Sequence, residues 1–259
     1  MKKDRAKRIP VVSMLNRREV LSFLGGTATV SLVGCLRGQS ASVETGTSTQ
    51  TLTRTAIATT PTCVVRPQQT EGPYFVDGKL NRSDIRSDPS DGSVKQGIPL
   101  RLVFHVSQID GSSCTPLTGA AVDLWHCDAL GIYSDVTDPS FSTVGKKFLR
   151  GYQVTDANGT VQFVTIYPGW YPGRTVHIHF KIRTGSTSQQ SYEFTSQLYF
   201  DDSLTDRIHA QPPYTAKGQR TLKNDRDGIF RGDGEQLMLQ LTKDAKGYVG
   251  TFDIGLQIT

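Results

Sequence analysis

The 259-residue chain lacks several features that mark common classes of protein. None of its four cysteines forms a C-x-x-C pair, which argues against a structural zinc site made of thiolates. An H-E-x-x-H motif, the helical signature of many zinc hydrolases, is also missing. No segment shows a long helical hydrophobic period, and no apolar run is long enough to span a bilayer permanently.

A basic surface for nucleic acid is also missing, although the formal net charge is +5. Residues 1–35 hold seven Lys or Arg against two Asp or Glu, so they account for the whole excess. The remaining residues are formally neutral, whereas nucleic-acid binding by counterion release requires a concentrated basic face. The balance therefore predicts no nucleic-acid partner.

The basic residues at the start belong to a pattern typical of exported proteins. In "NRREVLSFLGGTATVSLVGC", Arg17 and Arg18 precede a short, weakly apolar stretch that ends in Cys35. The stretch resembles a twin-arginine signal, and "LVGC" resembles a lipobox, whose cysteine is lipidated after cleavage. We expect residues 1–35 to direct export to the periplasm or cell envelope, with a lipid anchor at Cys35. An uncleaved anchor, or secretion with loss of Cys35, stays open.

A flexible tether is expected at residues 36–62, because Ser and Thr dominate there and few large apolar side chains can offset the entropy of ordering. The folded domain is then residues 63–259. An exported protein can form disulfides, and any one pair among Cys63, Cys114 and Cys127 can be bridged. Cys63–Cys114 is favoured, because Cys127 lies in a strand-like run.

Short runs with period-two alternation or β-branched residues recur along residues 63–259, separated by Gly, Pro, Asp and Asn. They predict an all-β fold, a β-sandwich of mixed or antiparallel strands with long loops, the longest at 201–235. The Asn-Gly dipeptide in "DANGT", 156–160, predicts a hairpin turn. The expected strands are 100–109, 120–127, 151–155, 160–167, 175–183, 192–200, 236–242 and 248–256.

The expected strand 175–183, "TVHIHFKIR", carries the clearest chemical signal. Side chains alternate across a strand, so His177 and His179 lie on one face while Ile178 and Phe180 lie on the other. Two imidazoles side by side can share a metal ion. A His-x-His pair alone fits a solvated or hydrogen-bonded histidine pair equally well.

Two tyrosines and an arginine accompany the histidines in loop-like sequence. "IYPGWYPGR" delivers Tyr171 and Arg174 just before the histidine strand, and "WHCDALGIYSD" places Tyr133 after another strand. With "QTEGPYF" (69–75) and "SQLYF" (196–200), these motifs resemble the intradiol ring-cleaving dioxygenases of catechols, a family of non-haem iron enzymes. The resemblance covers most of residues 63–259 and is greatest to exported members.

The resemblance implies a function and a set of site residues. It implies that iron(III) is held by Tyr133, Tyr171, His177 and His179, with a catechol-type aromatic diol and O2 as substrates and a muconate-type product. Hard phenolate oxygens suit the hard ferric ion. The resemblance also implies that Arg174, Tyr171 and Gln197 take part in catalysis: Arg174 stabilises negative charge on the substrate, Gln197 lies near that arginine, and one of the two tyrosinates is displaced when the catechol binds. Arg174 and Tyr74 are expected to contact the substrate.

Two rival functions remain from the residues alone. A non-catalytic β-sandwich module that binds a ligand or carbohydrate would not require two phenols and a cation at one point. A zinc hydrolase could combine His177 and His179 with a carboxylate such as Asp135. The sequence leaves open which catechol derivative is the substrate and whether the protein is a monomer or a homodimer.

Overall fold

The computed structural model describes residues 64–185 and 191–258, all within one contact unit, Ala56–Thr259. Its elements are mostly strands. They are β1 (Pro99–Asp110), β2 (Ser113–Pro116), β3 (Ala121–Trp125), β4 (Thr137–Asp138), β5 (Phe141–Ser142), β6 (Arg150–Val154), β7 (Thr160–Ile166), β8 (His177–Arg183), β9 (Glu193–Tyr199), β10 (Gln240–Lys243) and β11 (Tyr248–Leu256). The predicted all-β class is confirmed.

Two sheets make the body of the fold. One is five-stranded, with the order β10-β11-β1-β2 and with β7 also paired to β1, and the other is four-stranded, with the order β6-β3-β8-β9. β1 and β11 run parallel, whereas the other strand pairs are antiparallel. The predicted mixed β-sandwich is therefore correct.

The core lies between the two sheets and is rich in phenylalanine. Phe104 of β1 packs at 5.4 Å from Phe180 of β8 and at 5.8 Å from Phe252 of β11, measured between ring centroids. Phe163 of β7 meets Phe104 edge to face. Because Phe180 points into this core, its neighbours on β8 in sequence must point to the opposite face.

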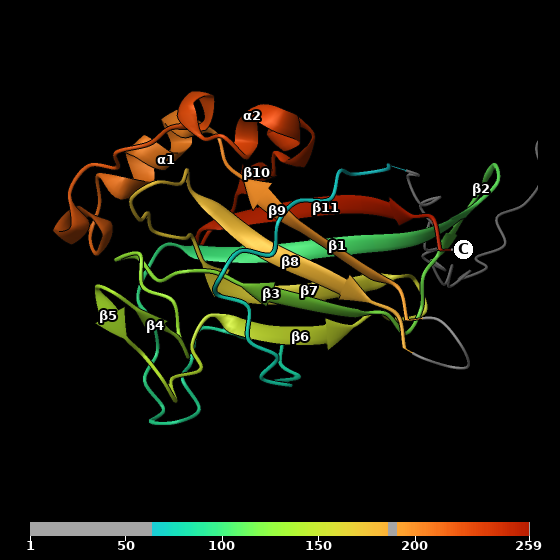
Figure 1. Ribbon diagram of the computed structural model, residues 1–259, viewed down its shortest axis with the longest axis horizontal. Helices are drawn as coiled ribbons and strands as arrows, with labels where there is room; N and C mark the ends of the chain where they lie inside the picture. The colour runs from blue at the N-terminus through green and yellow to red at the C-terminus, as the bar shows by residue number, and fades with distance from the viewer. Residues whose placement is uncertain (1–63, 186–190, 259) are drawn as a thin grey trace, which may run out of the picture. The chain divides into compact units, whose positions relative to one another are not determined.

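The segment 201–235, predicted as a loop, contains short helices. They are α1 (Asp202–His209), η1 (Tyr214–Lys217), η2 (Asn224–Arg226) and α2 (Phe230–Asp233), followed by η3 (Gly234–Leu237). Asp201 starts α1 by accepting a hydrogen bond from the backbone N–H of Leu204. In Figure 1, α1 and the β4–β5 pair lie at the same end of the two sheets, where β8 begins.

Two local predictions need correction. The strand predicted at 236–242 begins only at Gln240, since η3 occupies its first residues and turns Leu237 into the core. The 156–160 turn forms, with a hydrogen bond from the Asp156 N–H to the Thr160 carbonyl. It is not a hairpin, because it joins β6 to β7 in different sheets.

The cysteines agree with the expectation where the structure describes them. Cys114 is disulfide-bonded and Cys127 is a free, buried thiol. Cys63, like the signal at 1–35 and the tether at 36–62, lies outside the described residues. Within residues 64–185 and 191–258, no helix combines the length and apolar character needed to cross a bilayer.

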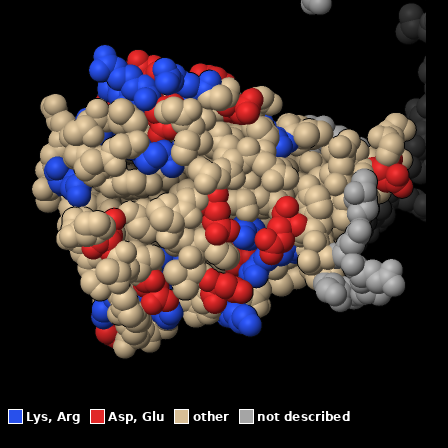
Figure 2. Space-filling model, in the orientation of Figure 1, with Lys and Arg blue, Asp and Glu red and all other residues tan. Residues whose placement is uncertain are grey.

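Charged side chains of both signs are interspersed on the visible face of the molecule (Figure 2). Basic and acidic residues alternate along its upper edge and across its centre, and no continuous basic stripe crosses this face. The even mixture matches the neutral balance of the sequence after residue 35.

Candidate metal centre

The two histidines occupy the start of β8, on the face turned away from the phenylalanine core. His177 and His179 are buried, and they alternate with the core residues Ile178 and Phe180. The pairing of β8 between β3 and β9 fixes their positions, with Trp125 and Gln197 on either side of His179. The strand alternation therefore places both imidazoles as predicted.

The imidazoles turn their Nε2 atoms toward each other. These two nitrogens are 3.1 Å apart. The Nδ1 of His177 lies 2.7 Å from the carbonyl oxygen of Thr175, which can only accept, so Nδ1 carries the proton and Nε2 keeps its lone pair. Two ligand atoms bound at about 2.1 Å with a right angle between them lie about 3 Å apart, which is the observed separation.

Both predicted tyrosine ligands reach the same point from loops. The Tyr171 hydroxyl is 3.2 Å from the Nε2 of His177. The Tyr133 ring meets the Tyr171 ring edge to face at 5.7 Å and lies 6.4 Å from the His179 ring, between centroids. The Tyr133 hydroxyl is buried without a hydrogen-bond partner among the described residues. The four side chains predicted from sequence are thus brought together.

Burial sets the protonation of this cluster. It lowers the pKa of His177 to about 3, helped by the charge of Arg174, and it lowers the pKa of His179 far below its usual value. Burial also raises the pKa of Tyr133, with a further contribution from Tyr171, and it raises that of Tyr171 despite the opposing charge of Arg174. Both histidines are therefore neutral near pH 7, and the phenols need a nearby cation to ionise.

These observations fit a metal ion better than an empty polar cluster. A buried phenol without a partner and two imidazole nitrogens facing each other are costly unless a common acceptor of electron pairs lies between them. Residues 64–185 and 191–258 contain no group of three or more His, Cys, Asp or Glu side chains able to hold a metal. Any metal held by the two imidazoles therefore depends on phenolate oxygens, a donor set that favours a hard, highly charged ion.

Arg174 is held beside the cluster by Asp227, by Gln197 and, at 3.4 Å, by the hydroxyl of Tyr199. Its Nε donates to the buried carboxylate of Asp227 at 2.8 Å, and its Nη2 donates to the Oε1 of Gln197 at 2.7 Å. Burial opposes the charge of Arg174, but Asp227 and the nearby tyrosines raise its pKa, so the guanidinium remains charged. A fixed cation in a site poor in water is suited to stabilise developing negative charge.

Gln197 is positioned by the segment that precedes Tyr74 in the sequence. Its Nε2 donates to the carbonyl of Thr70 at 2.9 Å, which orients Oε1 toward Arg174. Tyr199, one position along the same strand face, donates to the Oε1 of Gln69 at 2.7 Å. Gln197, which was predicted to lie near Arg174, thus contacts it directly.

Tyr74 lies over the two phenols. Its ring stacks on Tyr133 at 4.4 Å and meets Tyr171 edge to face at 6.2 Å. Its hydroxyl donates to the Oδ2 of Asp138 at 2.7 Å, and burial together with this bond raises its pKa to about 12. A cavity of about 290 Å³ adjoins this cluster and is lined by Tyr74, Gly131, Ile132, Asp138, Ser140, Phe141, Tyr171, Pro172 and Lys217.

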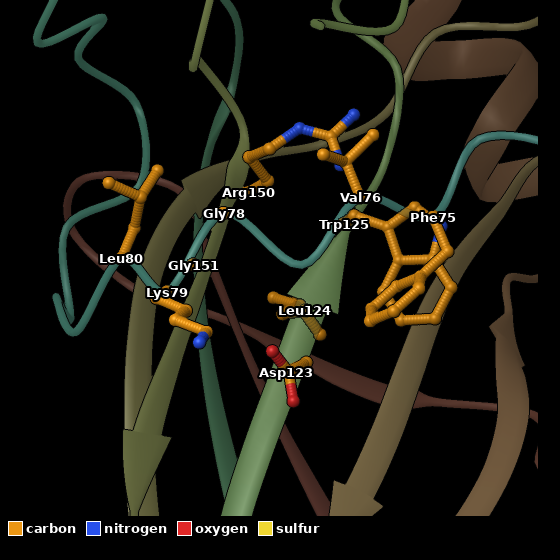
Figure 3. A pocket seen from close by; sticks show the side chains of 10 residues that line it. All are labelled: Phe75, Val76, Gly78, Lys79, Leu80, Asp123, Leu124, Trp125, Arg150 and Gly151. Atoms are coloured by element: carbon orange, nitrogen blue, oxygen red, sulfur yellow. The ribbon is translucent and has the colours of Figure 1, made fainter. Parts of the chain in front are cut away.

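Close packing covers the other side of the histidines. The Trp125 ring stacks on His179 at 5.0 Å, and Phe75 packs against Trp125 in turn (Figure 3). Gly72 has a φ of 71°, and a Cβ at this position would come within 3.2 Å of the His179 ring. The cavity drawn in Figure 3 measures only about 10 Å³, room for about one water molecule, so it is a packing gap and not a substrate site.

Asp135, the carboxylate of the rival zinc site, and the nearby histidine His126 have partners of their own. The Nδ1 of His126 donates to the Cys127 carbonyl and its Nε2 contacts the Thr165 hydroxyl, so this histidine is structural. Asp135 forms an ion pair with Lys147, and it is not the carboxylate of a zinc site with His177 and His179. A larger cavity of about 510 Å³ beside α1 contains none of the four predicted ligands.

Sequence reasoning missed Asp227 and Tyr199. Tyr199 could have been found from the sequence, because it follows Gln197 by two positions in "SQLYF" and therefore lies on the same face of the strand. Asp227 had none, since it lies in the segment 201–235, where no period indicates which side chains turn inward.

Comparison with known proteins agrees with this geometry. Residues 70–226 match a family model described as dioxygenase. An intradiol ring-cleavage dioxygenase from Tetranychus urticae is 32% identical, with a TM-score of 0.63 over 75% of this chain and 95% of that one. The chain belongs to the intradiol ring-cleavage dioxygenases.

Relatives within this dioxygenase family differ in length. The dioxygenase domain of a dioxygenase–carbohydrate-binding fusion from Streptomyces sp. SirexAA-E is 28% identical, with a TM-score of 0.52. The match covers 76% of this chain and 100% of that domain. Catechol 1,2-dioxygenase 1 of Acinetobacter lwoffii is 28% identical over 178 residues, 58% of this chain and 54% of that protein. The chain thus spans about half the length of this curated relative.

Proposed function

We propose that the protein is a non-haem iron(III) dioxygenase that cleaves a catechol-type ring between its two hydroxylated carbons. One O2 would enter the product, a muconate-type dicarboxylate, without an external reductant. The observation that carries the proposal is the convergence of two imidazole nitrogens, 3.1 Å apart, with the buried phenol of Tyr133, the half-buried phenol of Tyr171 and a fixed guanidinium. A binding module without turnover has no use for that combination.

The residues of this chain would divide the work. Tyr133, Tyr171, His177 and His179 would hold Fe(III), which when bound acts as a Lewis acid on the catecholate and makes it reactive toward O2. Tyr171 lines the cavity, so as a phenolate it is placed to accept a proton from an incoming catechol hydroxyl. Arg174, oriented by Gln197, would stabilise negative charge on the substrate. Tyr74 would contact the ring.

A visible spectrum with iron analysis tests this function. The purified protein is measured before and after anaerobic addition of catechol, and air is then admitted. A broad tyrosinate-to-iron band that shifts with catechol and decays in air would support the proposal. A colourless protein that shows no change after loading with iron would contradict it and favour the binding module.

We also propose export to the cell envelope with a lipid anchor at Cys35, supported by the order of Arg17-Arg18, the apolar stretch and "LVGC". Replacement of both arginines with lysine should keep the protein in the cytoplasm. Cys35→Ser should abolish labelling by radioactive palmitate while export continues. Labelling that persists in the Cys35 variant would refute the anchor.

A further inference from the structure

The cavity beside Tyr171 is the natural place for the part of a substrate that does not touch the metal. Its volume of about 290 Å³ lies at the small end of ligand pockets, which suits a single aromatic ring with a short substituent. Tyr74, Phe141 and Pro172 supply apolar walls. The charged groups among the lining residues therefore decide which substituent is accepted.

Two charged side chains line this cavity, and one of them is already satisfied. Asp138 accepts hydrogen bonds from the Tyr74 hydroxyl at 2.7 Å, from the Ser140 backbone N–H at 2.9 Å and from the Ser140 hydroxyl at 2.6 Å. Three donors compensate its charge, and the carboxylate is partly exposed, so solvent screens it further.

Lys217, the other charged group, has no such compensation. It ends η1, and no carboxylate in the described part of the chain forms an ion pair with it. Its Nζ lies 5.6 Å from the centroid of the Trp170 ring. Trp170 is tied to the same turn, because its Nε1 donates to the Gly218 carbonyl at 3.1 Å. The ammonium is thus held at the cavity next to Tyr171 without an anionic partner.

We infer that Lys217 binds a carboxylate on the substrate, so that the preferred substrates are catechols with an acidic substituent, of the dihydroxybenzoate type. The inference rests on the proposed function and deepens it. The catechol hydroxyls face the four ligands, and the ring lies in the cavity against Tyr74 and Tyr171. The carboxylate then meets Lys217 at the far wall of the cavity.

Substrate preference tests the inference directly. The value of kcat/KM is measured by O2 uptake for 3,4-dihydroxybenzoate and for catechol, and the ratio of the two is compared among variants. In Lys217→Met the ratio should fall about 10-fold, the effect of losing a hydrogen bond between charged groups. Lys217→Arg should keep the ratio, because it retains the positive charge. Lys246→Met, on the exposed β10–β11 turn, removes the same net charge and should leave the ratio unchanged.

Calorimetry separates failure of this inference from failure of the proposed function. Phenol and 4-hydroxybenzoate carry one hydroxyl and serve as ligands that are not cleaved. The wild-type protein should bind 4-hydroxybenzoate about 10-fold more tightly than phenol, and Lys217→Met should lose this preference. If neither diol consumes O2 but this preference holds, the function is wrong and the carboxylate site stands. If both diols are cleaved and the ratio is the same in Lys217→Met, the function stands and the role of Lys217 is refuted.

Discussion

Replacing Asp227 with asparagine would remove the charge from a buried carboxylate that organises the arginine side of the site. Its Oδ2 accepts from the Nε of Arg174 at 2.8 Å and from the N–H of Thr175 at 2.7 Å. Its Oδ1 accepts from the N–H groups of Ile229 and Phe230, at 2.8 and 3.0 Å. Burial alone would raise the pKa of Asp227, but these bonds hold it below its usual value.

An asparagine can face only two of these donors with its oxygen, and it turns an NH2 group toward the other two. Each hydrogen bond to a charged group contributes about 1.5–3 kcal/mol, so Asp227→Asn should lower the free energy of unfolding by about 3–5 kcal/mol. Arg174 keeps its bonds to Gln197 and, at 3.4 Å, to the Tyr199 hydroxyl, but its bond to the side chain of residue 227 is lost or weakened. A displacement of the order of 1 Å should lower turnover by roughly 100-fold.

Urea unfolding, O2 uptake and iron content measure the three consequences separately. Iron content should not change, because Asp227 does not contact the four predicted ligands through any hydrogen bond of its side chain. Asp225→Asn is the matched control, since Asp225 is exposed two positions earlier and should behave as wild type. Unfolding of Asp227→Asn within about 1 kcal/mol of wild type, with turnover reduced less than twofold, would refute the reasoning.

Two further results are expected. Tyr171→Phe or His179→Ala should lose bound iron and visible colour together with activity, whereas Arg174→Ala should retain iron while its turnover falls about 100-fold to 1,000-fold. Iron analysis combined with O2 uptake distinguishes the two results. Full turnover of Arg174→Ala would disprove the role of Arg174. The pKa of buried His126 is lowered to about 4, so its contribution to stability is complete above pH 6.5 and is lost as the pH falls toward 4. In urea titrations the advantage of wild type over His126→Gln should shrink by about 3 kcal/mol between pH 7 and pH 4, and a constant difference would show that folding does not lower the pKa of His126.

The sheet framework and the histidines followed from local pattern, because strand alternation needs no knowledge of the tertiary fold. In "TVHIHFKIR" alternate residues point to opposite faces of the strand, which is enough to assign the histidines to one face and the core residues to the other. The structure has the same assignment. The same argument overextended the strand at 236–242. There a 3-10 turn ends at Leu237 and the strand begins only at Gln240. Alternating apolar residues are compatible both with this arrangement and with one continuous strand, so the pattern cannot distinguish the two.

The tyrosines and Asp227 illustrate what local pattern does not contain. Tyr133 and Tyr171 lie on loops, so their meeting depended on the family resemblance and not on any period in the sequence. Asp227 meets Arg174 only because the segment 201–235 folds back over the start of β8, a long-range contact set by tertiary packing. The geometry brings the predicted ligands together, while their roles in catalysis remain predictions.

The aromatic core behind His177 and His179 depends on the parallel pairing of β1 with β11, the last strand of the chain. Phe104 of β1 pairs with Phe252 of β11, although most of the domain's sequence lies between these two residues. Phe252 also packs on Phe180, at 5.5 Å between ring centroids. Phe180 is the residue that follows His179 on β8. Contacts so distant in sequence are slow to form, because the entropy of closing a long loop must be offset first. The wall behind the predicted metal ligands is complete only after β11 has been synthesised and inserted, so, under the proposed function, chains that end before this strand should bind iron poorly.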